Sequence, residues 1–177
     1  MQTASPSKAK ALALAGLCTA VLAVLAPFSI AIGPVSLTLS LLGVFFTGAM
    51  LTPGWAAASV LAYIFLGAVG LPVFANMAAG VQVLVGVTGG YLWTYPLMAA
   101  LLSWTCRRTR HFALRLVGVV AGQLVCYLLG TVWFVFVTGM GVWGSLSLCV
   151  FPFIVPDFLK GLCALLMAGA VRRRLRL

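Results

Sequence analysis

Acidic side chains are almost absent from this sequence. Its 177 residues include one aspartate, Asp157, and no glutamate, and only 7% of the residues are charged. A soluble domain usually carries about a quarter charged residues, so this chain has too few to cover a water-facing surface. A single carboxylate also excludes a hydrolytic carboxylate dyad and an acidic metal site. With 64% hydrophobic residues, the composition indicates an integral membrane protein.

The sequence also lacks an ATP-binding motif and any cluster of metal-binding or catalytic side chains, which limits the activities that the chain can have. The sequence has no Walker A pattern, so it does not hydrolyse ATP by that route. The five cysteines form no C-x-x-C pair, and His111 lies among arginines with no acidic neighbour. Cysteines inside apolar runs act as small hydrophobic residues. We therefore expect no enzyme activity, no metal site, no disulfide and no cofactor, and active transport would need a partner or an ion gradient.

Apolar runs are what the sequence has in abundance. Residues 1–177 allow six spans of about 20 residues with short connections, in one transmembrane domain. The first run also resembles a secretory signal, and Leu14-Ala15-Gly16 before Cys18 resembles a lipoprotein signal. Leu17 is too large for the lipoprotein signal and the rest of the chain is equally apolar, so we interpret this run as a span. The predicted spans are 10–27, 37–51, 55–71, 89–106, 112–138 and 152–171.

Positive charge is confined to the flanks of these spans. Ten of the eleven basic residues lie in three places, which six spans put on one side of the membrane. Basic residues concentrate in cytoplasmic flanks, so the pattern predicts cytoplasmic N- and C-termini and argues against a nucleic-acid surface. The ten residues are Lys8, Lys10, Arg107, Arg108, Arg110, Arg115, Arg172, Arg173, Arg174 and Arg176.

The three longer connections, 28–36, 72–88 and 139–151, fall on the outer side in this topology. They are apolar and rich in glycine, unlike ordinary solvated loops. Irregular backbone at membrane depth is tolerated where it is buried in protein or lines a cavity. We expect these segments to fold inward as a lid over an outward-facing pocket. The alternative is that they are interfacial loops.

Asp157 and Lys160 are the exceptional ionisable pair. Lys160 is the one basic residue away from the basic flanks, and it follows Asp157 by three positions. In a helix these residues share a face, and Pro156 suits a first helical turn. Charged groups inside a membrane are costly and usually functional. The pair is either a ligand-binding dipole or a self-satisfied structural ion pair.

Asn76 and Gln82 are the main amides near this predicted site. Each donates and accepts hydrogen bonds, which suits a ligand with urea-like or amide edges. Either amide could instead hold its own loop together, and for Gln82 that is the better interpretation. The aromatic residues near the outer segments either stack on a ligand ring or belong to the interfacial aromatic belt. They are Tyr91, Trp93, Tyr95 and Trp143.

Small residues at four-residue spacing mark close helix packing. Ala11 and Ala15 have this spacing in the first span, and Gly118 and Gly122 have it in the fifth. Such residues let two helices approach closely. The first span therefore offers a smooth surface where a partner could dock, although the spacing alone is weak support.

Four sequence blocks resemble one known family. In order, they are GPVSLTL at 33–39, LGAVGLPVFA at 66–75, GVTGGY at 86–91 and PFIVPDFLK at 152–160. Together they are similar to the biotin-specific S components of energy-coupling factor (ECF) transporters, the BioY family. The resemblance implies an all-α, six-helix membrane subunit that binds biotin outside the cell. It also implies a transmembrane coupling protein and two ATPases as partners, in a bacterial plasma membrane.

The resemblance also implies residue roles. The family's polar ligand contacts carry over to Asn76, Asp157 and Lys160. Gln82 and Tyr91 are further binding candidates from their side-chain chemistry and position in the sequence. Small residues of the first helix, such as Ala11 and Ala15, are the expected coupling surface. The alternatives are a secondary carrier, an S component for another vitamin, and a structural subunit.

The sequence departs from the family in three ways. Ser40 stands where the family often has glutamine. The turn 52–54 (TPG) lacks the usual basic residues, and no arginine in the outer segments is available for the biotin carboxylate.

Overall fold

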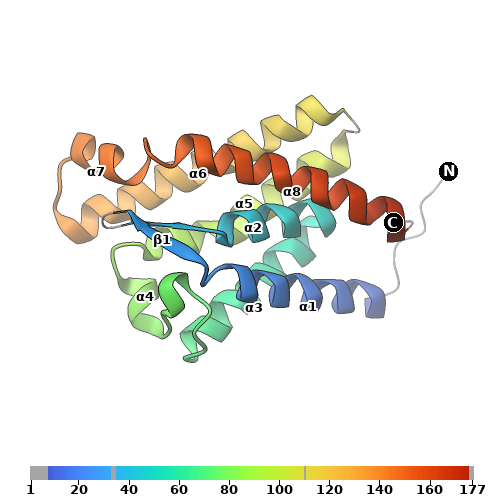
Figure 1. Ribbon diagram of the computed structural model, residues 1–177, viewed down its shortest axis with the longest axis horizontal. Coiled ribbons are helices and arrows are strands. Elements are labelled where there is room, and N and C mark those ends of the chain that lie inside the picture. Colours follow the sequence, from blue (N-terminus) through green and yellow to red (C-terminus); the bar gives the residue numbers. More distant parts are fainter. Residues whose placement is uncertain (1–7, 33–34, 110, 176–177) are drawn as a thin grey trace.

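The computed structural model describes residues 8–32, 35–109 and 111–175 and is mainly helical. Six long helices run along the molecule (Figure 1). Three stretches are long and apolar enough to cross a membrane, 8–25, 112–138 and 154–174, and α2 and α3 are shorter apolar helices. The six are α1 (Lys8–Leu25), α2 (Ser40–Met50), α3 (Pro53–Ala68), α5 (Gly89–Arg108), α6 (Phe112–Thr138) and α8 (Ile154–Leu175).

These helices match the six predicted spans in order. The fifth prediction, 112–138, coincides with α6, which ends where Gly139 adopts a φ of 70°. That left-handed conformation favours glycine and stops a helix. The second prediction began too early, at 37 instead of Ser40, because residues 35–38 form a strand.

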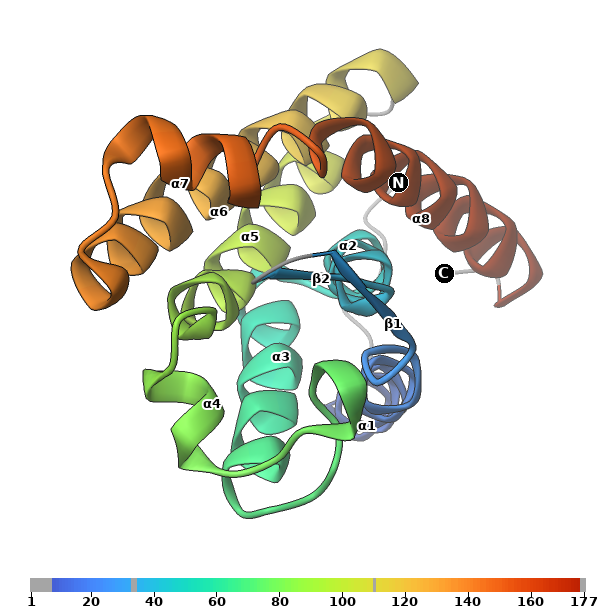
Figure 2. The same cartoon turned by 60° about the vertical axis from the view of Figure 1, so that its left-hand side comes forward.

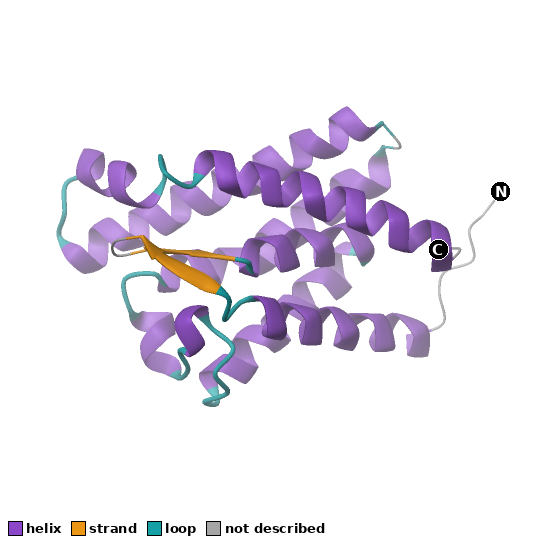
Figure 3. Ribbon diagram, in the orientation of Figure 1, coloured by secondary structure: helices purple, strands orange, loops and turns teal. Residues whose placement is uncertain are grey.

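The three longer connections, which were predicted to be loops, contain regular structure. β1 (Ser29–Ile32) and β2 (Val35–Thr38) pair antiparallel, with Ser29 opposite Thr38 (Figure 3). Val35-Ser36-Leu37-Thr38 alternates apolar and polar residues, which is the period of a strand. The Gly33-Pro34 pair between the strands lies outside the described residues. The other two segments contain the 3-10 helix η1 (Ala75–Met77), α4 (Val81–Val85) and α7 (Val142–Cys149).

The two ends of the bundle carry different residues. The hairpin, α4 and α7 lie at one end, the left of Figure 1, which we call the loop end. The start of α1, the end of α5, the start of α6 and the end of α8 lie at the other end. This is the basic end, and its described basic residues are Lys8, Lys10, Arg107, Arg108, Arg115, Arg172, Arg173 and Arg174. Arg110 and Arg176 lie outside the described residues.

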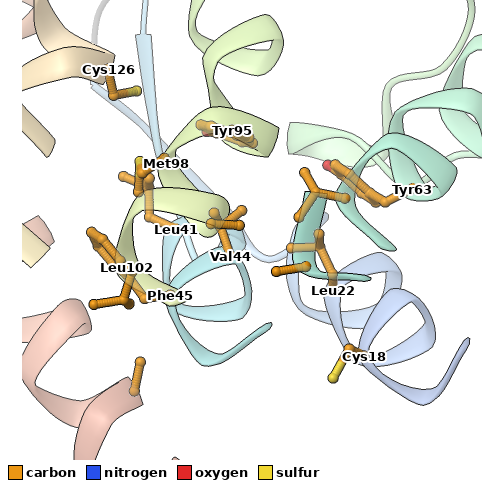
Figure 4. Close-up of a cluster of buried hydrophobic side chains, with 14 of the residues drawn as sticks. Cys18, Leu22, Leu41, Val44, Phe45, Tyr63, Tyr95, Met98, Leu102 and Cys126 are labelled. Carbon is orange, nitrogen blue, oxygen red and sulfur yellow. The ribbon is translucent and has the colours of Figure 1, made fainter. Parts of the chain in front are cut away.

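Helix α5 is central to the packing, against α2, α3 and α6 (Figure 2). Gly48 of α2 is packed so tightly on α5 that a Cβ there would lie 2.7 Å from the Ala99 carbonyl oxygen. Gly118 and Gly122 both face α5, against Thr105 and Met98, as their four-residue spacing predicts. Leu22, Val44, Phe45, Met98 and Leu102 belong to the apolar core (Figure 4).

Candidate ligand-binding site

A cavity of about 270 Å³ lies at the loop end of the bundle. Ligand pockets usually enclose about 300–1,000 Å³, so this one suits a small ligand. Its walls come mainly from β2, the η1 segment and the loop-end parts of α2, α3, α5, α6 and α8, with single residues from α4 and α7. Its polar and aromatic lining includes Ser36, Thr38, Ser40, Tyr63, Phe74, Asn76, Tyr91, Tyr95, Tyr127, Asp157 and Lys160.

The ionic centre of the cavity is Asp157, in the first turn of α8. Its side chain is almost fully buried, with 2% of the residue surface exposed. Lys160 Nζ donates to Asp157 Oδ1 over 2.8 Å, in the same-face arrangement that the spacing predicts. The amino end of a helix also favours a negative charge. The carboxylate therefore has both a counter-ion and a favourable helix position.

Tyr127 and Gln123 of α6 support this carboxylate, although neither was predicted as a site residue. The Tyr127 hydroxyl donates to Asp157 Oδ2 over 2.9 Å, so both carboxylate oxygens are engaged. Gln123 Nε2 in turn donates to the Tyr127 oxygen over 2.8 Å. The available signal was weak: two polar side chains four residues apart in an otherwise apolar span.

Asn76 lies at the cavity wall and joins η1 to the hairpin. Its Oδ1 accepts from the Ser29 hydroxyl over 2.9 Å, and its Nδ2 donates to the Ser36 oxygen over 2.9 Å. The residue has a left-handed φ of 56°. A primary amide has two donor hydrogens and two acceptor lone pairs, so each end of Asn76 can make one further bond.

Tyr91 and Tyr95 come from α5 and are both buried in the cavity wall. The Tyr91 hydroxyl is 3.2 Å from Thr131 Oγ1. The Tyr95 hydroxyl is 3.2 Å from Ser40 Oγ, and Ser40 also contacts the Thr38 hydroxyl. Ser40, one of the departures from the family pattern, therefore belongs to the cavity wall.

The remaining predicted aromatic residues point elsewhere. Trp93 is half exposed and donates through Nε1 to the Leu84 carbonyl oxygen over 3.2 Å. Trp143 is 78% exposed on α7. These positions fit the aromatic-belt interpretation better than stacking on a ligand in the cavity.

Gln82 is outside the cavity wall. It is exposed at the start of α4, and its Nε2 donates to the Ala79 carbonyl oxygen over 2.6 Å. This local bond corresponds to the second interpretation of Gln82, an amide that holds its own loop together.

Ala11 and Ala15 lie inside the subunit, with 8% and 5% of their surface exposed. The hydroxyls of Thr19 and Ser59 both donate to the Ala15 carbonyl oxygen, which ties this face of α1 to α3. Ala9 and Ala13 are exposed on the outer face instead. The apolar sequence of α1 gave no sign of which face turns inward.

A second cavity, about 630 Å³, lies between α6, α7 and α8. Its lining is apolar apart from Gln123, Tyr127 and Thr131, which reach it from α6. Tyr127 therefore separates the two cavities. The first cavity is the better candidate site because it holds the ion pair and several converging polar groups.

Comparison with known proteins identifies the family. The BioY family model matches residues 1–177. The chain belongs to the BioY family. A biotin transporter of Thermotoga maritima is 39% identical over 162 residues, covering 90% of this chain and 94% of the relative. A probable biotin transporter of Pyrococcus horikoshii is 37% identical over 161 residues, covering 91% and 95%.

A solved structure shares the BioY fold. It is the S component for biotin from an ECF-type ABC transporter, with a TM-score of 0.87 and 24% identity. The match covers 97% of this chain and 95% of that chain. This likeness confirms the predicted fold class, a helical S component. Family and apolar helices together place the chain in a membrane.

Proposed function

We propose that this chain captures biotin outside the cell and is the substrate-binding subunit of an ATP-driven ECF importer. The observation that carries the proposal is the buried Asp157–Lys160 pair at the wall of a small cavity. Family membership and the names of the relatives support the choice of ligand.

Biotin's fused ureido ring matches the polar groups of the cavity. A carboxylate has about four acceptor directions, so Asp157 can accept a ureido N–H while keeping its bonds to Lys160 and Tyr127. The Lys160 ammonium and the Asn76 amide can donate to the ureido carbonyl. Tyr63, Phe74 and neighbouring apolar side chains supply a surface for the thiophane ring and valeryl chain.

The proposed role requires partners. The chain has no Walker A pattern, so the ATP-driven step falls to two ATPases joined through a transmembrane coupling protein. The proposed docking surface on α1 includes the exposed Ala9 and Ala13 rather than the inward-facing Ala11 and Ala15. Small residues there would let a partner helix approach closely.

The proposed orientation puts the loop end outside and the basic end in the cytoplasm. Clustering of the described basic residues at one end of the bundle supports this orientation. The cavity then faces the outer side of the plasma membrane of a bacterium, with residues 1–177 acting as one transmembrane domain.

The test is biotin binding by the purified protein, measured by calorimetry. Asp157→Asn removes the charge but keeps the shape, and should weaken binding by about 1–3 kcal/mol or more. Ser147→Ala is the control, because Ser147 is exposed on α7 and bonds only locally to the Trp143 carbonyl oxygen. Equal affinity in the Asp157 variant and the unmodified protein would refute the site. Gradient-driven uptake by this chain alone in proteoliposomes would favour a secondary carrier.

A further inference from the structure

The basic end contains an arginine cluster that the proposed biotin site does not use. Three arginines lie there near the ends of different helices: Arg107 at the end of α5, Arg115 near the start of α6 and Arg172 near the end of α8. The positive charges of Arg107 and Arg115 both act on Arg172. Like charges at close range repel, so this arrangement is unfavourable unless an anion joins it.

Arg172 has an unsatisfied donor inside this cluster. Its Nε is buried and has no hydrogen-bond acceptor among the described residues. Buried polar groups nearly always have partners, and an unpaired donor on a charged group is particularly unfavourable. The described residues therefore leave this donor unsatisfied, and the guanidinium has four further N–H donors that can bind an anion.

The chain's own acidic side chain is elsewhere. Asp157, the one acidic residue of the sequence, lies at the loop end and is paired with Lys160. The carboxyl ends of α5 and α8 offset part of the arginine charge, since each helix end carries roughly half a negative charge. After that offset, the three arginines still leave an excess of about two positive charges.

Arg115 and Arg172 are partly buried, whereas Arg107 and the other described arginines are exposed. Arg108 lies over the Trp104 ring, with its Cζ 5.2 Å from the ring centroid. Arg173 and Arg174 are exposed at the end of α8. In contrast, Arg115 is half-buried, and its Nε–H donates to the Thr109 carbonyl oxygen over 3.1 Å. That bond uses one of five guanidinium donors and holds the side chain against the α5–α6 turn.

We propose that Arg107, Arg115 and Arg172 form a binding site for the phosphate group of an anionic phospholipid. Guanidinium groups match phosphate geometry and bind it through paired hydrogen bonds. The site lies where three membrane helices end, which is the depth of lipid headgroups. Basic pockets between membrane helices on the cytoplasmic side characteristically bind such headgroups.

The experiment is native mass spectrometry of the detergent-purified protein with added lipid. The unmodified chain should retain one phosphatidylglycerol more strongly than phosphatidylcholine, whose phosphate is neutralised by its own choline. Arg172→Gln should lower phosphatidylglycerol retention about tenfold, because a charged bidentate partner is lost. Arg174→Gln is the matched control, with the same charge change on the same helix, and should lower retention less than about twofold.

Four results would overturn the proposal. Equal losses in the Arg172 and Arg174 variants would mean that general surface charge attracts the lipid. Equal retention of the two lipids would remove the requirement for an anionic headgroup. Displacement of the lipid by excess inorganic phosphate would assign the site to a soluble anion. Arg115→Gln provides a second cluster variant if Arg172→Gln does not fold, and retention equal to that of the unmodified chain would likewise refute the site.

Discussion

The two ends of the bundle hold charge in opposite ways. At the loop end, the Asp157 carboxylate is buried and both its oxygens accept hydrogen bonds, from Lys160 and Tyr127. At the basic end, arginines converge without an acidic side chain, and the buried Nε of Arg172 has no acceptor among the described residues. The loop end is therefore internally neutralised, whereas the basic end depends on its surroundings for counter-charge.

This difference follows from the surroundings of each charge. A charge buried inside the protein is too costly to leave unpaired, so Asp157 needs partners that the protein itself supplies. Charges at the interface meet water and lipid headgroups, which can neutralise them from outside. Breaking the Asp157–Lys160 pair should therefore lower the stability of the protein far more than removing one charge at the basic end.

The largest expected effect comes from removing only the acid of the loop-end pair. Asp157→Leu leaves Lys160 as an unpaired buried charge, and loss of one partner typically costs about 3–5 kcal/mol of stability. Arg174→Gln removes one exposed charge and should change stability by less than about 0.5 kcal/mol. Denaturation of both variants in detergent, without ligand, measures the contrast.

A double variant separates stability from binding at the same place. Asp157→Leu with Lys160→Met replaces the whole pair by apolar side chains, which is often neutral for stability. We expect the double variant to regain most of the lost stability while failing to bind biotin. If the double variant stays as unstable as Asp157→Leu, the lost stability comes from packing. An unpaired charge would then cost less at the loop end than we expect.

A smaller effect is expected from the hydroxyl that holds Asp157 in place. Tyr127→Phe removes the donor to Asp157 Oδ2, and hydrogen bonds to charged groups contribute about 1.5–3 kcal/mol. We expect biotin affinity to fall about tenfold or more, because the carboxylate loses its fixed orientation. Calorimetry measures the change.

Thr138→Val is the control for this variant. It also removes a hydroxyl from α6, but that hydroxyl donates locally to the Phe134 carbonyl oxygen. Unchanged affinity in both variants would show that Lys160 alone is sufficient to position Asp157.

The features that could be predicted from the sequence depend on a rare residue type or on the spacing of residues within one helix. Asp157 and Lys160 stand out because ionisable residues are so few, and their three-residue spacing in a helix determines their contact. Gly118 and Gly122 similarly predicted close packing of α6. These inferences require no knowledge of how distant segments meet.

Features that depend on helix rotation or tertiary contact were harder to predict. Helix α1 is apolar on most sides, so its sequence did not reveal that Ala11 and Ala15 turn inward. Tyr127 meets Asp157 only because α6 and α8 pack together, 30 residues apart in sequence. The hairpin escaped prediction because its strands have four residues each, the shortest length at which alternation of apolar and polar residues indicates a strand.

The smallest effect is expected at Gln82, and it contrasts two amides of one segment. Asn76 lines the cavity, whereas Gln82 is exposed and bonds the Ala79 carbonyl oxygen. Gln82→Ala should therefore change biotin affinity by less than about twofold, because an exposed local hydrogen bond contributes little. Asn76→Gly is the comparison, since glycine accepts the φ of 56° and the variant loses the amide together with its bonds to Ser29 and Ser36. It should weaken binding about fivefold, the equivalent of one ordinary hydrogen bond of about 1 kcal/mol. If titration calorimetry instead gives Gln82→Ala the larger loss, α4 must move toward the cavity when ligand binds, and the polar site at the loop end would be assembled by the ligand rather than preformed.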